Sequence, residues 1–243
     1  MTPTAESSPR TGTQILDALE TIGPRPVLAW YGEAARIELS GHVLANWVIK
    51  SIGHLHDEID LAPGDPVVLD LPAHWKRLVL ALACWSLGAE VTVLDRGADG
   101  EADLTRLPHL TDLTRLPELP EAPRAVLTDR PASELAESAD EVLALEAVSL
   151  APRYAGELPP LVHDWLAEVR GSSDRLGLAL PAWSGPASEG DAAEAAPRLL
   201  VEGDGLGELP RVLGALLAGG GIVGPAVAVT ERQAQEEGVT GRL

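Results

Sequence analysis

Residues 39–95 constrain the fold more than any other stretch, because they carry in order the signals for a helix, a turn, a strand, a second helix and a second strand. Ser40 stands where a helix N-cap is expected, since its hydroxyl can accept a hydrogen bond from the first turn. Beyond it, apolar residues recur every three or four positions, which predicts one buried helix face. That face carries Leu44, Trp47, Val48, Ile52, Leu55 and Ile59.

A turn at Pro63 and Gly64 ends this helix, because Pro63 fixes φ and Gly64 can adopt the positive φ of a type II turn. The strand at residues 67–71 is almost continuously apolar, which is typical of a strand buried on both faces of a parallel sheet. A helix over residues 74–87 and a strand over residues 91–94 complete a strand-helix-strand unit, and such units are parallel. The predicted class is therefore α/β, a mostly parallel sheet with flanking helices, in which Trp47 and Trp85 are buried.

Asp70 and Asp95 lie near the carboxyl ends of these two neighbouring strands. Ligand crevices of open α/β sheets lie at that edge. A carboxylate at such a position is more often solvated or capping a loop than bound to a ligand, and we expect this for both.

The pattern of residues 27–95 resembles the N-terminal subdomain of AMP-binding enzymes, the acyl-CoA synthetase-like, adenylate-forming superfamily. The shared features are LS before a helix, L-x-PGD before a strand, LP after that strand, and GAE before V-x-VLD. The segments LANWVIK and LPAHW look closer still to a small actinobacterial family of synthetase-like proteins that lack most of the enzyme's machinery. The resemblance implies a truncated domain of the same α/β fold.

Composition excludes several classes of function. The net charge of −19, from 37 acidic and 18 basic residues, disfavours binding to nucleic acids and to anionic membranes. The chain contains no run of 18 apolar residues and no signal-peptide pattern, so we expect a cytoplasmic protein. Cys84 is the single cysteine and is expected to be an inert thiol packed in the core. The oligomeric state stays open.

The chain is expected to form a mobile leader, residues 1–13, and one domain, residues 14–243. Within the domain, residues 97–123 are acidic, rich in Leu-Pro and contain DLTRLP twice, which predicts an exposed excursion. Residues 181–197 are rich in Gly, Ala, Ser and Pro, and we expect a mobile, exposed loop. The remaining predicted elements are a helix at 14–20, a hairpin at 26–31 and 35–39, strands at 125–128 and 141–145 around a helix at 131–138, a helix at 158–170, a possible strand at 176–180, a strand at 199–201, a helix at 209–218, an edge strand at 222–229 and a helix at 231–237.

The resemblance implies a phosphate loop, ending in lysine, within residues 181–197. Ser184 and Gly185 fit such a loop, but the segment has no threonine and no lysine. It brings instead Glu189, Asp191 and Glu194, whose charges oppose phosphate binding. The family's later motifs would lie beyond Leu243, and no residue here matches them.

Gly203, Gly205 and Gly207 offer a competing interpretation, because they follow a predicted strand and precede a predicted helix as in a dinucleotide-binding loop. Glu208 occupies the place of the third glycine of that fingerprint, so the match is one residue short. The alternative is an acidic loop without a nucleotide, which we favour.

The run His54-Leu55-His56-Asp57-Glu58 raises the question of a metal site. On a helix only the pairs His54/Glu58 and His56/Asp60 share a face, and two ligands do not make a zinc site. We therefore expect a solvated helix face, with His163 as a surface or cap residue. No metal site, no hydrolase motif and no catalytic residue is predicted.

Together these observations favour a degenerate, non-catalytic relative of the AMP-binding enzymes that acts by binding a protein or a small apolar acid. No cofactor is predicted. The alternative is an enzyme with residual nucleotide or acyl-group chemistry, using ATP, AMP or coenzyme A. Under that alternative, the candidates for cofactor binding are Ser184, Gly185, Gly203, Gly205 and Gly207.

Overall fold

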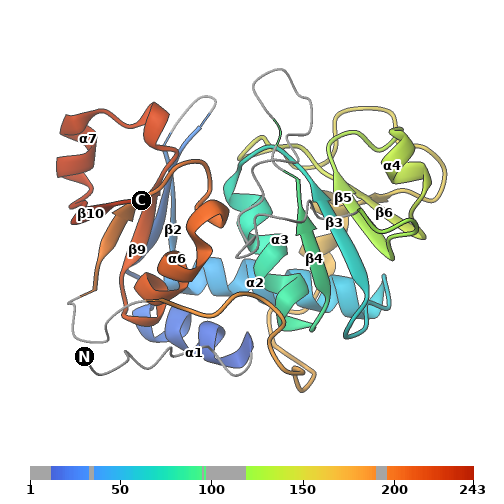
Figure 1. Ribbon diagram of the computed structural model, residues 1–243, viewed down its shortest axis with the longest axis horizontal. Helices are drawn as coiled ribbons and strands as arrows, with labels where there is room; N and C mark the ends of the chain where they lie inside the picture. The colour runs from blue at the N-terminus through green and yellow to red at the C-terminus, as the bar shows by residue number, and fades with distance from the viewer. Residues whose placement is uncertain (1–11, 33–35, 95, 97–118, 190–195) are drawn as a thin grey trace, which may run out of the picture.

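The structure is a computed structural model that describes residues 12–32, 36–94, 96, 119–189 and 196–243. The strands of these residues form two five-stranded sheets, which stand side by side in Figure 1. The predicted α/β class with mostly parallel strands is confirmed, although the strands divide between two sheets. Most of the predicted leader, residues 97–118 of the Leu-Pro excursion, and Asp95, Asp191 and Glu194 lie outside the described residues.

The first sheet is entirely parallel and has the strand order β4-β3-β5-β6-β7. Its strands alternate between a large core on one face and a small cluster on the other. Val67 and Leu69 face the large core, whereas Val68 packs with Ala136 of the short helix α4 (Glu134–Glu137). Both faces are thus buried, as the apolar run predicts. The bounds are β3 Pro66–Asp70, β4 Glu90–Val93, β5 Ala125–Thr128, β6 Glu141–Ala144 and β7 His163–Asp164.

The second sheet is mixed and has the order β10-β8-β9-β1-β2. The predicted hairpin is confirmed as the antiparallel pair β1 (Pro26–Tyr31) and β2 (Arg36–Ser40), and the other neighbours are parallel. The strands β8 (Arg198–Leu200), β9 (Gly221–Gly224) and β10 (Gly241–Arg242) complete it. The edge position expected for β9 is wrong: β9 pairs on both sides, because Pro225 follows the strand and its missing N–H is not needed within it.

Four helices pack together and share one core with both sheets. They are α1 (Gly12–Ile22), α2 (Gly41–Asp57), α3 (Trp75–Ser86) and α6 (Leu209–Leu217). Helix α2 runs behind both sheets in Figure 1; it contacts β1 and β2 directly and reaches the parallel sheet through α3. Its predicted cap is confirmed, since Ser40 accepts a hydrogen bond from the Val43 amide.

The tryptophans and the cysteine of these helices test the predicted helix phases. Trp85 is buried, as predicted, whereas Trp47 is only half-buried and packs against Trp75 and Trp165 at ring-centroid distances of 5.5 and 5.9 Å. Cys84 is enclosed by protein, and burial raises the pKa of its thiol to about 12. Its predicted position in the core is confirmed.

The helix expected at residues 158–170 is wrong in its first half. His163 and Asp164 form β7, and Asp164 then caps a short helix, α5 (Trp165–Glu168), by accepting from the Ala167 amide. Leu161, counted as a core residue of that helix, is 95% exposed and has φ +68°. The chain enters the sheet instead of continuing as a helix, because Asp164 satisfies the amides of a new helix start.

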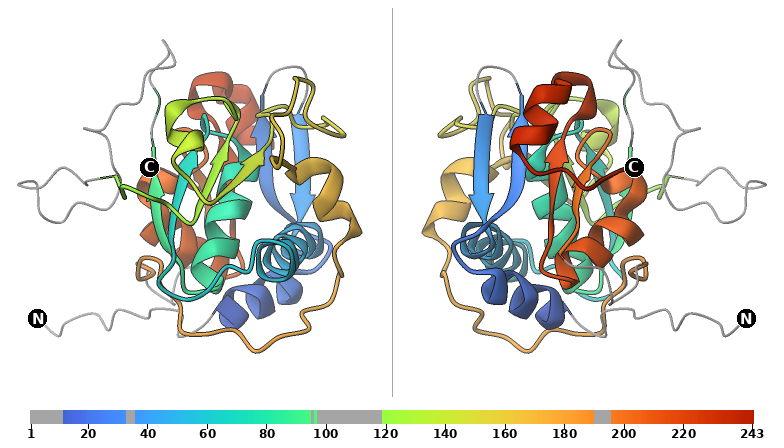
Figure 2. Two further views of the ribbon diagram at one scale, coloured as in Figure 1. Left: turned by 90° about the vertical axis from the view of Figure 1, so that its right-hand side faces the viewer. Right: turned by 90° about the vertical axis from the view of Figure 1, so that its left-hand side faces the viewer.

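The remaining segments are short. A 3₁₀ turn, η1 (Val169–Gly171), follows α5, and η2 (Leu206–Glu208), η3 (Ala226–Ala228) and α7 (Glu231–Glu236) surround the mixed sheet. Figure 2 shows α1 and α7 at opposite ends of that sheet. The strand considered for residues 176–180 is absent. Within the parts of the chain that the structure describes, no helix has both the length and the apolar character needed to cross a membrane.

Candidate functional site

The carboxyl edge of the parallel sheet gathers charged side chains. The Asp70 carboxylate at the end of β3 is fully buried, contrary to the solvated position expected for it. It accepts hydrogen bonds from Arg130 Nη2 at 3.0 and 3.1 Å and from Thr128 Oγ1 at 3.0 Å, and Arg96 Nε lies 3.4 Å away. Two guanidinium groups and one hydroxyl thus surround Asp70, so its carboxylate oxygens are already engaged by groups of the chain itself.

The glycine loop after β8 meets the same region from the other sheet. Asp204, in its centre, is buried and forms a bidentate ion pair with Arg77 of α3, with Nε–Oδ2 and Nη2–Oδ1 distances of 2.6 and 3.0 Å. The amides of His74 and Leu206 also donate to this carboxylate. We call this contact the inter-sheet pair. It places a protein carboxylate where the dinucleotide interpretation requires a phosphate.

The geometry of the glycines in this loop follows from packing. Gly203 and Gly205 have φ values of +56° and +83°, which favour glycine. A Cβ on Gly203 would lie 3.1 Å from the Ala73 side chain, and one on Gly205 would lie 3.0 Å from Val212. Gly207, by contrast, has open space around it.

His74 and Lys76 at the start of α3 are buried polar residues that the sequence interpretation did not single out. His74 Nδ1 accepts from the Lys76 amide at 3.2 Å and caps the helix, while Nε2 lies 3.2 Å from Ser149 Oγ. Burial, helped by the Lys76 charge and opposed by Asp204, lowers the pKa of His74 to about 3. Lys76 Nζ donates to the carbonyls of Val148 and Glu146 at 2.6 and 3.3 Å. Both side chains therefore anchor the loop after β6.

Ser184 and Gly185 lie at the opposite edge of the parallel sheet. The Ser184 hydroxyl donates to the carbonyls of Ala89, just before β4, and Trp85, near the end of α3, at 2.8 and 3.3 Å. A Cβ on Gly185 would come within 2.6 Å of Trp183 and 2.8 Å of Trp85. The five cofactor candidates are thus divided between the amino edge of one sheet and the carboxyl end of a strand in the other.

The expected exposure of residues 181–197 is wrong for part of the described segment. Ser188 is buried, Trp183 Nε1 donates to the Pro186 carbonyl at 3.0 Å, and the Glu189 amide donates to the Pro210 carbonyl at 2.7 Å. This segment packs around Trp183, against Trp85 of α3 and against the start of α6. Its Gly-, Ala-, Ser- and Pro-rich composition did not indicate these contacts.

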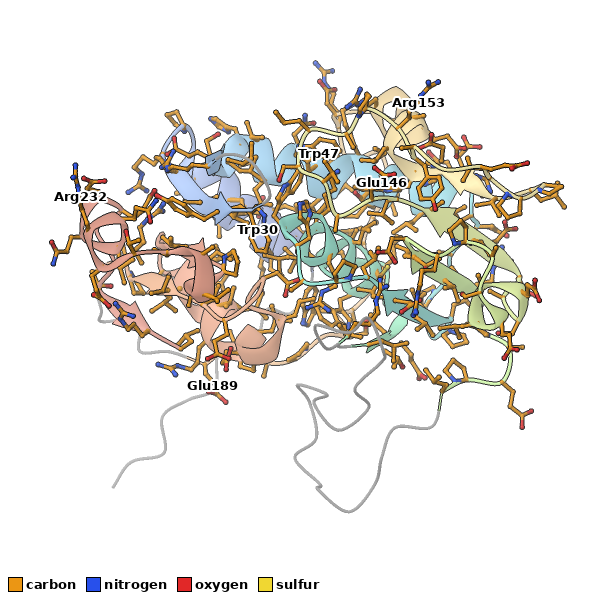
Figure 3. The ribbon with its side chains drawn as sticks, turned by 90° about the horizontal axis from the view of Figure 1, so that it is seen from above. Trp30, Trp47, Glu146, Arg153, Glu189 and Arg232 are labelled. Atoms are coloured by element: carbon orange, nitrogen blue, oxygen red, sulfur yellow. The ribbon has the colours of Figure 1, made fainter. Side chains whose placement is uncertain are left out.

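A pocket of about 520 Å³ opens beside the ends of β6 and β7. Its walls combine apolar and charged side chains, namely Glu146, Ala151, Pro152, Arg153, Tyr154, Ala155, Gly156, Leu158 and Asp164. Asp164 accepts from the Tyr154 amide at 3.1 Å, and Glu146 accepts from the Ala155 amide at 3.0 Å. Figure 3 shows Arg153 extending outward, on the side of the molecule opposite Glu189.

A second polar cluster lies between α2 and the outer strand of the parallel sheet. Glu168 Oε2 lies 2.9 Å from His54 Nε2 and 2.8 Å from His163 Nδ1, and the two rings stand at 88° with centroids 5.9 Å apart. Burial raises the pKa of Glu168, but the hydrogen bonds with the two histidines together lower it by more. The net shift of this pKa is therefore downward. We call these three residues the histidine–glutamate cluster.

The contact between His54, His163 and Glu168 was not predicted from the sequence. His54 is 1% exposed rather than on a solvated face, while His56 pairs with Asp57 in solvent at 2.7 Å. The available signal was Asp164, a residue type favoured at helix N-caps, whose carboxylate accepts from the Ala167 amide. A helix starting there would have placed His163 before the helix and not within it.

Two solved structures of synthetases share the fold of this chain. An acyl-CoA synthetase from Brucella canis matches 99% of this chain with a TM-score of 0.63 at 16% sequence identity. An acetoacetyl-CoA synthetase from Streptomyces lividans matches 97% with a TM-score of 0.63 at 17% identity. The chain has an acyl-CoA synthetase-like fold. It spans 48% and 42% of those two chains, and therefore less than half of either.

One curated relative matches at the level of sequence. The TIGR03089 family protein of Mycobacterium tuberculosis is 38% identical over 90 residues, which are 35% of this chain and 36% of that protein. No protein-family model matches the sequence. The synthetase-like fold predicted from residues 27–95 is thus confirmed and extends over nearly the whole chain.

Proposed function

We propose that this chain is a synthetase-like binding protein that does not adenylate its ligand, and that it holds a small, largely apolar carboxylic acid in the pocket beside β6 and β7. The observation that carries the ligand class is the charge balance of the pocket. Asp164 and Glu146 are occupied by backbone amides, whereas the Arg153 side chain has no hydrogen-bond or ion-pair partner among the described residues.

The pocket walls support the same ligand class. Ala151, Pro152, Ala155 and Leu158 supply apolar contact area, and a single free guanidinium at the rim can bind a carboxylate through two parallel hydrogen bonds. A volume of about 520 Å³ falls in the range of ordinary small-molecule sites. An acid with a short hydrocarbon tail would therefore match both the charge and the walls.

The absence of adenylation is proposed from residues that are present. A magnesium-nucleotide site needs free cations and amides for phosphate and a free carboxylate for the metal. Asp70 is neutralised by arginines, Asp204 fills the glycine loop, and Ser184 donates to backbone carbonyls. These groups are already committed to interactions within the chain.

Calorimetric titration tests the ligand class. We expect hexanoate to bind and 1-hexanol to bind at least about tenfold more weakly, because the alcohol lacks the charge that Arg153 recognises. Arg153→Gln should weaken hexanoate binding by a similar factor. Arg175→Gln is the matched control, since it removes the same charge from an exposed arginine outside the pocket. Equal affinity in Arg153→Gln and the unmodified chain would contradict the proposed ligand.

Titration with ATP and magnesium tests the alternative. Tight, magnesium-dependent binding, or protection from hydrogen exchange at residues 181–197 only when ATP or coenzyme A is present, would favour an enzyme with residual nucleotide or acyl-group chemistry. We expect neither effect. If no carboxylic acid binds and a protein partner does, the function is protein binding instead.

A further inference from the structure

The histidine–glutamate cluster combines the ligand types of a transition-metal site. His54 comes from α2, His163 from β7 and Glu168 from α5, and one ligand atom of each lies within 4.8 Å of the other two. Two imidazoles and one carboxylate are a common set for zinc in proteins. His54 lies 114 residues from Glu168 in the sequence, whereas His163 and Glu168 are only 5 residues apart. The fold therefore brings His54 to a pair of ligands that local structure already places together.

We propose that His54 Nε2, His163 Nδ1 and the Glu168 carboxylate form a binding site for a divalent transition-metal ion of the zinc class. The three ligand atoms leave one position of a tetrahedron for solvent, because Glu168 and His163 are partly exposed while His54 is buried. This proposal does not depend on the proposed acid-binding function, although Asp164 lines the pocket and its amide donates to Glu168.

Neighbouring groups orient two of the three ligands. His163 Nε2 lies 3.4 Å from Glu141 Oε2, and a carboxylate on the second ring nitrogen supports a metal-binding imidazole. Glu168 Oε1 accepts from the Asp164 amide at 3.1 Å, which turns Oε2 toward both histidines. Glu141 and Glu168 also supply negative charge for the cation.

His54 limits the expected affinity. Its Nδ1 is buried and has no hydrogen-bond partner among the described residues. When a metal binds Nε2, the neutral ring carries its proton on Nδ1, where an unpaired buried N–H is unfavourable. We therefore expect weaker binding than at structural zinc sites in which both ring nitrogens are satisfied.

A competing account makes the cluster a purely structural hydrogen-bond contact, in which both histidines share Glu168 and tie α2 to α5. Metal binding distinguishes the two accounts. In the structural account added zinc changes nothing, whereas a metal site gains stability by mass action when zinc is in excess.

The test is equilibrium dialysis of the full chain, without an affinity tag and after treatment with chelator, against ZnCl₂, with zinc and protein quantified. The unmodified chain should bind one equivalent of zinc, and its Tm should rise by roughly 3–6 °C in excess zinc. His163→Gln and Glu168→Gln should each lower zinc affinity at least about tenfold. Circular dichroism without metal verifies that both variants, which change partly exposed residues, are folded.

His56→Gln is the matched control, because His56 lies on the same helix, exposed and two residues from His54. It should bind zinc like the unmodified chain. Absence of stoichiometric zinc from the unmodified chain, equal binding by His163→Gln, or an equal loss in His56→Gln would each overturn the proposal. Co²⁺ substitution offers a second readout, since a tetrahedral site with nitrogen ligands gives strong visible absorption that His163→Gln should lose.

Discussion

The inter-sheet pair and the histidine–glutamate cluster each use one carboxylate to join distant segments, yet they differ in what surrounds it. Asp204 receives four donors, two of them from a permanently charged guanidinium, and both side chains are almost fully buried. Glu168 instead contacts two imidazoles and one backbone amide, and it is partly exposed. A carboxylate with every acceptor site filled by fixed donors locks two sheets together, whereas one held by imidazoles can exchange its partners for an ion.

The largest effect expected from this difference is at the inter-sheet pair. Arg77→Met leaves Asp204 as an unpaired buried charge and should lower the free energy of unfolding by about 3–5 kcal/mol. Urea denaturation measures the change. The double variant Arg77→Met/Asp204→Leu should recover much of the loss, because it leaves neither charge of this pair buried without its partner. A loss below about 1 kcal/mol in the single variant would mean that the pair does not join the sheets.

The next effect is pH dependence beside the inter-sheet pair. His74 has an ordinary pKa near 6.5 in the unfolded chain and a pKa of about 3 in the folded protein, because it is buried. As pH falls from 6.5 toward 3, only the unfolded chain takes up this proton, so stability should fall by up to about 1.4 kcal/mol per pH unit.

His74→Asn separates this contribution from other titrating groups. Asparagine keeps a side-chain acceptor for the cap of α3 but does not titrate. The free energy of unfolding of this variant is measured with urea at several pH values. Between pH 6.5 and pH 3 its slope against pH should be smaller than that of the unmodified chain, by an amount corresponding to the uptake of up to about one proton. An unchanged slope would show that His74 is not the group responsible.

A smaller effect is expected at the histidine–glutamate cluster. Without metal, Glu168→Gln should lower the free energy of unfolding by about 1 kcal/mol, since the amide oxygen still accepts a hydrogen bond and the site is partly exposed. The same urea experiment measures it. A loss as large as that of Arg77→Met would remove the distinction between the two carboxylates.

The smallest effect is expected for His56, which lies on the same helix but in solvent. His56→Gln should change stability by less than about 0.5 kcal/mol, because its pair with Asp57 is exposed. A thermal melt is sufficient to detect a larger value, which would indicate a contact of His56 with another part of the chain.

The sequence predicted the parallel sheet well because its signals are local. Pro63 and Gly64 mark the turn before β3, the apolar run of β3 fits burial on both faces, and Ser40 caps α2. The helix predicted over residues 158–170 is wrong in its first half, because their apolar spacing fits a helix while Asp164 caps a shorter one. The position of β9 between two partners could not be inferred, since strand order depends on pairings across the whole chain.

The candidate sites were less predictable than the fold. Asp70 was placed at the correct edge of the sheet, but its arginine partners Arg96 and Arg130 come from loops beyond other strands. His54 and Glu168 are adjacent only because α2 packs beside α5 and η1. The approach of Asp204 to Arg77 likewise follows from docking of the two sheets. Spacing along one element contains no information about such contacts.

The pairing of β1 has a consequence for the order in which the protein folds. The parallel sheet uses residues from one continuous part of the chain, from β3 to β7, whereas Leu28 of β1 pairs with Ile222 of β9. During synthesis the parallel sheet can therefore assemble first, while one side of β1 waits without a partner until β9 has emerged. Such long-range closure slows folding and leaves an apolar strand edge open to association with other chains. Helix α2, which contacts β1 and precedes β9 in the chain by far, can keep β1 covered on one face during that interval.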